Sequence, residues 1–248
     1  MKPMLCAKAT LEVVNSLDDN WIAEEKYDGI RAVIKGGKLF CRRGNDITYK
    51  YPEFKGIESI KETIDGEVIC ATFSEAQSRI HTQDKFKIKI LAIKSPATFV
   101  AFDCVDVGRL SQRRATLESI SFPEWVTIAP QREDIQNLWD EVMAKSGEGI
   151  VVKNVNATYQ EGKRSPEWLK VKAFKETTAR FTKLSDHPRG VRLETADGKS
   201  VNCNGAQAEV VKALFNKQGF VDVEVQYMPQ ESGDAWRFPS FKRLVGDV

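Results

Sequence analysis

The sequence predicts an α+β domain over residues 1–173, followed by a small β-barrel over residues 174–248. In the first part, short strand-like runs bounded by glycine turns alternate with segments that have helical spacing. In the second part, several short β-like runs surround a single helix. About 75 residues of this texture are typical of a small Greek-key barrel such as an OB-fold.

Turn signals and apolar spacing define the elements of the first domain. Gly36-Gly37 separates the runs Arg31–Lys35 and Lys38–Arg42, which predicts a two-residue β-hairpin. Helices are expected over Ser111–Ile120 and Glu133–Lys145, where apolar residues recur at helical spacing. Further strands are expected at Glu67–Cys70, Thr98–Phe102, Gly149–Lys153 and Trp168–Lys172.

The second domain is predicted from four β-like runs and one helix. Asp197-Gly198 gives a clear hairpin turn, and the helix is expected over Ala206–Lys217. The strands are expected at Thr178–Leu184, Val191–Thr195, Lys199–Cys203 and Val221–Tyr227. The change of texture places the domain boundary near Ala173.

Overall charge does not indicate a partner, because 37 basic and 35 acidic residues give a net charge of only +2. Any basic surface must therefore come from local clustering. The clusters are Lys85-Phe86-Lys87-Ile88-Lys89, Arg42-Arg43, Lys163-Arg164, Lys170-Val171-Lys172 and Lys242-Arg243.

Cysteine usage and hydropathy indicate a protein of the cytoplasm. The five cysteines form no C-x-x-C pair and there are only two histidines, which argues against a zinc site or a disulfide framework. No run approaches the roughly 18 apolar residues that a membrane span needs. The N-terminus lacks the apolar core of a secretory signal, so we expect a cytoplasmic protein without membrane attachment.

The segment from Glu24 to Arg31 carries the sharpest chemical signal. Lys26 closes a β-like run, a turn follows at Gly29, and Arg31 begins the next strand. This arrangement would present Lys26 and Arg31 to the same concavity. A lysine in such a place can act as a nucleophile.

Other residues supply what a phosphoryl-transfer site needs besides a nucleophile, namely a metal ion and cations for the phosphate. Glu67 and Glu148 offer carboxylate oxygens, which suit Mg²⁺. Lys170 and Lys172 alternate with apolar residues, so both point to one face of a strand. Together they could clamp a phosphate.

Five ordered motifs resemble the covalent nucleotidyltransferase superfamily, which contains polynucleotide ligases and mRNA capping enzymes. They are Lys26 to Arg31, Asp65 to Val68, Phe99 to Asp103, Glu148 to Lys153 and Leu169 to Lys172. The likeness is strongest to small ATP-dependent DNA ligases of phage or bacterial type. It implies an ATP-grasp-like adenylation domain over residues 1–173 and an OB-fold over residues 174–248. It also implies ATP, Mg²⁺ with Mn²⁺ as a substitute, and a monomer acting on nicked double-stranded DNA.

The resemblance assigns residues to the nucleotide. Lys26 matches the lysine that becomes joined to AMP, and Glu24 matches the residue that helps to select adenine. Arg31 would hold the ribose, and Phe102 would stack on the base. Lys153 ends its motif near the nucleotide.

The resemblance also assigns residues to the metal and to DNA. Glu67 would serve the ribose or the metal, and Glu148 the metal. Arg42, followed by Arg43, matches a serine-arginine motif that grips the nicked strand. Cys41 stands where that motif usually has serine.

The C-terminal segment Trp236–Arg243 resembles the R-F/H-P-x-F segment of phage and bacterial ligases. The family's last motif supplies cations that orient the pyrophosphate leaving group. Arg237, Lys242 and Arg243 are the candidates here, for the leaving group or for DNA.

Three other functions fit parts of the pattern. An RNA ligase or a GTP-dependent capping enzyme would use the same scaffold, although the segment at Arg237 and the run from Glu148 to Lys153 weigh against capping. A non-catalytic OB-type nucleic-acid-binding protein is the alternative from another class. The intact set of Lys26, Glu148 and Lys170 argues against it.

Overall fold

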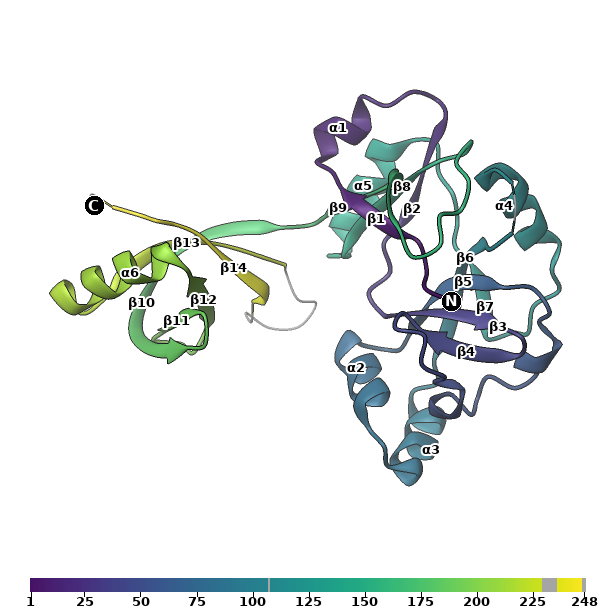
Figure 1. Ribbon diagram of the computed structural model, residues 1–248, viewed down its shortest axis with the longest axis horizontal. Coiled ribbons are helices and arrows are strands. Elements are labelled where there is room, and N and C mark those ends of the chain that lie inside the picture. The colour runs from purple at the N-terminus through teal and green to yellow at the C-terminus, as the bar shows by residue number, and fades with distance from the viewer. Residues whose placement is uncertain (107, 229–235, 247–248) are drawn as a thin grey trace. The chain divides into compact units, whose positions relative to one another are not determined.

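The computed structural model describes residues 1–106, 108–228 and 236–246. The chain divides into two compact units, Met1–Lys172 and Ala173–Val248 (Figure 1). In the first unit, two sheets carry the motifs described above. In the part of the chain that the structure describes, no helix is long and apolar enough to cross a membrane.

The first sheet brings the Lys26 and Glu148 motifs side by side. Its strands, in spatial order, are β1 (Leu5–Lys8), β9 (Arg164–Lys172), β8 (Gly149–Asn154) and β2 (Trp21–Glu25). β1 runs parallel to β9, and the other neighbours are antiparallel. Helices α1 (Leu11–Asn15) and α5 (Ile135–Ala144) share an apolar core with this sheet. The predicted strand at Trp168–Lys172 is the second half of the longer β9.

The second sheet carries Arg31 and Glu67. Its strands, in spatial order, are β4 (Lys38–Cys41), β3 (Ile30–Lys35), β5 (Ile64–Ile69), β6 (Thr98–Cys104) and β7 (Val126–Ile128). The predicted hairpin is confirmed, because Gly36 and Gly37 join β3 to β4 with φ of 55° and 71°. Two 3₁₀ turns, η1 (Thr48–Lys50) and η2 (Ile57–Ser59), follow β4.

Three helices accompany the second sheet (Figure 1). They are α2 (Phe73–His81), α3 (Lys85–Lys94) and α4 (Leu110–Ser119). α4 confirms the helix expected over Ser111–Ile120, and α5 confirms the one expected over Glu133–Lys145. Met4, Phe102 and Trp168 meet in a small apolar cluster that takes residues from both sheets. This cluster forms the support on which the candidate site is built.

The second unit is an antiparallel sheet with one helix. Its strands, in spatial order, are β12 (Ser200–Asn204), β11 (Gly190–Thr195), β10 (Lys175–His187), β13 (Val221–Met228) and β14 (Arg237–Leu244). The edge strands β12 and β14 approach each other, so the sheet nearly closes into a barrel. Helix α6 (Ala206–Gln218) packs on its core. The architecture agrees with the predicted OB-fold.

Gly149 shows how tightly β8 and β9 approach at the site. It has φ of +136°, and a Cβ built there would lie 2.1 Å from the Val171 carbonyl oxygen. Any other residue would therefore be strained in its backbone and would also collide with the neighbouring strand.

We expect Gly149→Ala to destabilise the first unit by about 3 kcal/mol or more, because strain and collision act together. Gly56→Ala is the matched control: its φ is +77°, but nothing lies within 4 Å of the added Cβ. It should cost about 1 kcal/mol, the strain alone. Urea unfolding measures both, and equal losses would show that the close approach to β9 is unimportant.

Candidate active site

Lys26, Glu148 and Lys172 form an ion-pair cluster at the ends of three neighbouring strands. The Glu148 carboxylate contacts Lys26 Nζ at 2.5 Å through Oε2 and Lys172 Nζ at 2.8 Å through Oε1. Backbone pairing fixes the arrangement, because the Lys26 amide donates to the Gly149 carbonyl at 2.9 Å. Gly149 in turn pairs in register with Lys172. The structure thus brings together three residues that are up to 146 positions apart in the sequence.

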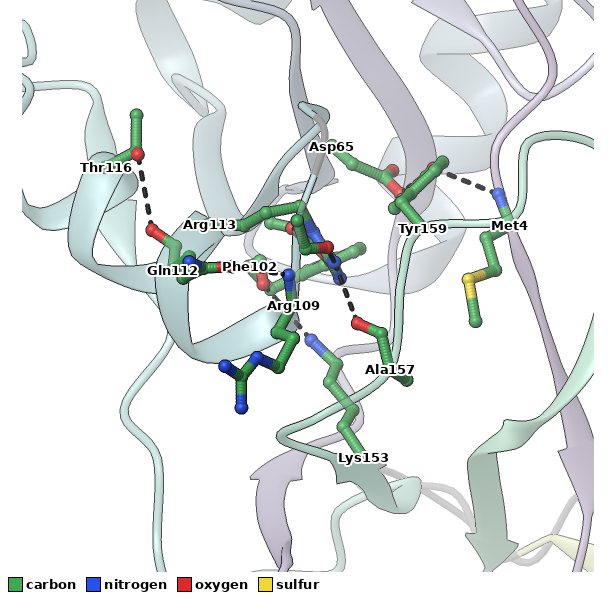
Figure 2. A network of polar contacts seen from close by, with 12 residues as sticks. Met4, Asp65, Phe102, Arg109, Gln112, Arg113, Thr116, Lys153, Ala157 and Tyr159 are labelled. Atoms are coloured by element: carbon green, nitrogen blue, oxygen red, sulfur yellow. Dashed lines mark hydrogen bonds and ion pairs between the residues drawn. The ribbon is translucent and has the colours of Figure 1, made fainter.

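Arg31 is held in place by a buried carboxylate. Its guanidinium donates two hydrogen bonds of 2.6 Å to Asp65, whose side chain is fully buried. Tyr159 donates to the same carboxylate at 2.6 Å and accepts from the Met4 amide at 2.9 Å. Figure 2 shows Tyr159 between Asp65 and Met4. Asp65 raises the pKa of Arg31 despite the opposing effect of burial.

Two cations contact the Phe102 ring in the apolar cluster. The Arg31 guanidinium is 4.5 Å from its ring centroid, and Lys153 Nζ is 4.7 Å from it. Trp168 meets the ring edge-on, with centroids 6.3 Å apart. Contacts of a cation with an aromatic face are attractive. They fix the ring beside Arg31.

Glu24 is buried and has both oxygens occupied by donors. Lys153 Nζ lies 2.6 Å from one oxygen, and the Gln131 amide donates to the other at 2.9 Å. Lys153 also donates to the Phe102 carbonyl at 3.1 Å (Figure 2). Glu24, Lys153 and Phe102 thus belong to one network.

Several residues of these networks were not anticipated from the sequence. Gln131 and Tyr159 lie outside the motifs, and nothing in their local sequence marks them. Arg113 on α4 makes a buried bidentate pair with Asp103 at 2.8 and 2.9 Å. It also donates to the Ala157 carbonyl at 2.9 Å, a contact drawn in Figure 2. This pair ties α4 to the end of β6, next to Phe102.

Glu67 faces Arg31 across the β3–β5 pairing. Burial raises the pKa of Glu67 to about 7, and the charges of Glu148 and Asp65 add to the rise, whereas Arg31 and Lys26 oppose it. Glu67 and Glu148 are thus close enough to repel each other, an arrangement that a divalent cation would relieve. Two carboxylates completed by phosphate oxygens are a usual Mg²⁺ site. Among the described residues, no group of three or more His, Cys, Asp or Glu could form a larger one.

A hollow of about 600 Å³ opens beside Lys26. Its charged lining is mostly cationic and comprises Lys26, Arg31, Arg42, Arg43, Lys50, Arg164 and Lys170, against Asp46 and Glu67. His81, for which the sequence indicated no role, also lines it. The hollow brings the predicted DNA residues Arg42 and Arg43 to the same cavity as the predicted nucleophile.

The cations of this hollow differ in their partners. Lys26 and Arg31 are paired with carboxylates, whereas Lys170, Arg164 and Arg42 have no carboxylate partner among the described residues. Burial lowers the pKa of Lys170, and the neighbouring charge of Arg164 lowers it further. Lys170 is partly buried, whereas Arg42 and Arg164 are exposed. Three neighbouring cations without a carboxylate partner favour a bound anion.

The three C-terminal candidates lie on β14, in the second unit. Arg243 pairs with Glu224 on β13, and Lys242 Nζ lies 3.9 Å from the Glu176 carboxylate. The Arg237 guanidinium lies 5.4 Å from the Phe238 ring centroid. β14 is the edge strand next to β13, so these cations share one sheet edge.

We expect Lys153→Met to destabilise the protein by about 3–5 kcal/mol, because Glu24 would keep a buried charge without its cation. The same substitution in a Glu24→Gln background should cost far less. Thermal or urea unfolding of the parent, the two single variants and the double variant gives the coupling free energy between Glu24 and Lys153. Additive losses would mean that the Glu24–Lys153 pair is not a unit.

Comparison with known proteins places this arrangement in a family. The SPβ prophage-derived DNA ligase-like protein LigB of Bacillus subtilis is 29% identical over 197 residues, which cover 74% of this chain and 72% of that protein. The bifunctional non-homologous end joining protein LigD of Bacillus subtilis is 30% identical over 194 residues, covering 63% of this chain. This chain covers 32% of LigD and 39% of DNA ligase 1 of Methanosarcina mazei, about a third of their lengths.

Solved structures show the same fold over the whole chain. A Lig E DNA ligase, described as binding DNA with a minimal scaffold, has a TM-score of 0.76 at 20% identity and covers 99% of this chain and 100% of its own. The ATP-dependent DNA ligase of bacteriophage T7, in complex with ATP, has a TM-score of 0.55 at 18% identity and covers 98% of each chain. Residues 3–172 match the family model of the ATP-dependent DNA ligase domain. The chain therefore belongs to the family of ATP-dependent DNA ligase domains.

Proposed function

We propose that this chain seals nicks in duplex DNA with ATP, through a lysyl-AMP intermediate and a DNA-adenylate. The observation that carries the proposal is the position of Lys26. Its amine contacts Glu148 and lines a hollow in which Lys170 and Arg164 have no carboxylate partner among the described residues. An amine nucleophile beside unneutralised cations suits attack on a phosphate. Membership of the ligase-domain family supports the same reaction.

The reaction consists of three phosphoryl or nucleotidyl transfers. Lys26 Nζ attacks the α-phosphorus of ATP, an N–P bond forms, and the bond to the bridging oxygen breaks as pyrophosphate leaves. The Lys26 ammonium loses one proton to solvent before it attacks, and the amine loses a second proton to solvent as the N–P bond forms. Glu148 Oε2, 2.5 Å from Nζ, holds the amine in place. An oxygen of the 5′-phosphate then attacks the AMP phosphorus and releases Lys26. Finally the 3′-hydroxyl loses its proton to solvent and attacks the 5′-phosphate, so that a new O–P bond forms, the P–O bond to AMP breaks, and AMP departs.

Residues around Phe102 form the proposed nucleotide site. Phe102 would stack on adenine, and Glu24, held by Lys153, would accept a hydrogen bond from the adenine amino group. Arg31 would hold the ribose. Asp65 orients Arg31 by accepting hydrogen bonds from its guanidinium, and Tyr159 orients Asp65 by donating to the same carboxylate. Each step is an in-line displacement, so positioning of this kind accounts for much of the catalysis.

Glu67 and Glu148 are the proposed metal ligands, for Mg²⁺ with Mn²⁺ as a substitute. Glu148 contacts Lys26, and Glu67 lines the hollow beside Lys26, so a divalent cation held by both carboxylates would lie next to the proposed nucleophile. When bound, the cation supplies charge stabilisation on the phosphate oxygens. Lys172, the second partner of Glu148, would keep that carboxylate oriented.

The cations of the hollow that have no carboxylate partner among the described residues form the proposed DNA-phosphate site. Arg42 and Arg43 enter it from the segment after β4, Lys170 from β9, and Arg164 from the start of the same strand. A terminal 5′-phosphate carries a concentrated negative charge, which such a group can neutralise. The chain would act as a monomer in the cytoplasm, without sequence preference, because phosphate contacts carry no sequence information.

The second unit is proposed to supply cations for the pyrophosphate. Arg237, Lys242 and Arg243 share the edge strand β14, and Lys170 and Arg164 of the first unit are assigned to the DNA phosphate. A departing pyrophosphate needs positive charge of its own. RNA sealing on the same scaffold would appear as activity on a nicked RNA duplex, and use of GTP as a lysyl-GMP adduct when GTP replaces ATP.

A nicked duplex with ATP and Mg²⁺ should be converted to a sealed strand by this protein, and Lys26→Ala should abolish the product. Lys38→Ala, which removes a surface cation from β4, should leave sealing unchanged. Denaturing gels measure the sealed strand made by the parent protein and by each variant. A chelator of divalent cations should stop sealing by the parent protein. Full sealing by the Lys26→Ala protein would exclude the proposed nucleophile.

Arg42→Ala should reduce sealing of a pre-adenylylated nick at least tenfold while changing the rate of Lys26 adenylylation little, because a lost charge-assisted contact costs about 1.5–3 kcal/mol. Single-turnover assays of the two steps measure the difference. Equal loss in both steps would place Arg42 on the nucleotide instead of DNA.

Simultaneous change of Arg237, Lys242 and Arg243 to alanine should slow lysine adenylylation strongly and affect the sealing of pre-adenylylated DNA less. The reason is that only the first step expels pyrophosphate. A normal adenylylation rate combined with lost sealing would make these three residues DNA contacts.

A further inference from the structure

Helix α3, over Lys85–Lys94, concentrates positive charge outside the candidate site. It contains Lys85, Lys87, Lys89 and Lys94, all exposed, and no acidic residue. Four of the 37 basic residues of the chain thus lie within ten consecutive residues that contain no acidic side chain.

The lysines of α3 are not neutralised. Within the part of the chain that the structure describes, none of the four has a carboxylate within ion-pair distance. Surface lysines elsewhere often have one, as Lys145 does with Glu25 and Lys183 with Glu194. Four like charges on ten residues repel one another, so an anionic partner would stabilise the helix.

α3 also exposes an apolar ridge between its lysines. Phe86 and Ile93, which are 73% and 82% exposed, are seven residues apart and so lie on one face. The opposite face carries Ile88, which is buried in the protein. Lys87 and Lys89 flank the ridge on either side, given 100° of rotation per residue. The partner must therefore accept both cations and an apolar contact.

The helix begins at the edge of the hollow that holds Lys26. His81 and Gln83 line the hollow, and the next residue, Asp84, caps the first turn of α3 with hydrogen bonds to the amides of Phe86 and Lys87. Figure 1 shows α2 and α3 extending from the end of the first unit beyond β4. A duplex with its nick in the hollow could continue along this extension.

We propose that α3 is a second DNA-binding surface, which contacts the backbone of the duplex away from the nick. Lys85, Lys87 and Lys89 would neutralise phosphates, and Phe86 would pack against the apolar edges of the sugars. This inference rests on the proposed function, because it takes duplex DNA as the substrate. The surface would hold DNA of any sequence, since it makes only backbone contacts.

The test is the salt dependence of binding to a nicked duplex. Each phosphate contact contributes about 0.9 to the slope of log K against log salt. Changing Lys85, Lys87 and Lys89 to glutamine, which keeps helix propensity, should lower this slope by about 2 to 3. Affinity at about 100 mM salt should fall at least tenfold.

A matched variant changes Lys35, Lys55 and Lys61 to glutamine, three exposed lysines of the first unit without carboxylate partners among the described residues. It removes the same charge and should leave the slope within about 0.5 of the parent value. Substitution of Phe86 by serine should weaken binding severalfold at every salt concentration without changing the slope.

A parental slope and affinity in the α3 triple variant would overturn the inference, and so would an equal effect in the control variant. Loss of binding to anionic vesicles or to an acidic peptide in the α3 variant, with DNA binding intact, would also overturn it.

The proposed function and the inference about α3 can fail separately. If the parent protein forms the Lys26 adduct and seals nicks, the proposed function stands whatever α3 does.

Discussion

The candidate site depends on one carboxylate held between two lysines. Glu148 contacts Lys26 and Lys172, which end strands on either side of β8, so the ion pairs fix the nucleophile to the sheet. Gly149 makes the arrangement possible, because its positive φ and missing side chain let β8 approach β9 closely. The strand ends, the nucleophile and the proposed metal ligand are therefore set by the same few backbone contacts.

Charge is distributed in two ways around this centre. Arg31 is paired with Asp65 and Arg113 with Asp103. Each pair fixes the position of its side chains, although both charges lose hydration. Lys170, Arg164 and Arg42 in the hollow, like the lysines of α3, have no carboxylate partner among the described residues. Paired charges thus shape the nucleotide site, and unpaired charges remain available to a polyanion.

Much of this could be predicted from the sequence, where local signals were strong. The Gly36-Gly37 hairpin and the two helices with apolar spacing form as expected, and Lys26, Glu148 and Lys172 do meet. Gln131 and Tyr159 could not be found in this way, because their partners lie about a hundred residues away and they carry no motif. The Lys85–Lys89 cluster was visible, but its helix and exposed ridge became clear only in the structure.

The central claim is that Lys26 is the nucleophile, and peptide mapping by mass spectrometry tests it most directly. The protein is incubated with ATP and Mg²⁺, digested under conditions that preserve a phosphoramidate, and searched for an AMP adduct. We expect the adduct on Lys26 alone. An adduct on Lys170 or Lys172, both of which lie close to Lys26, would contradict the account even if nicks were sealed.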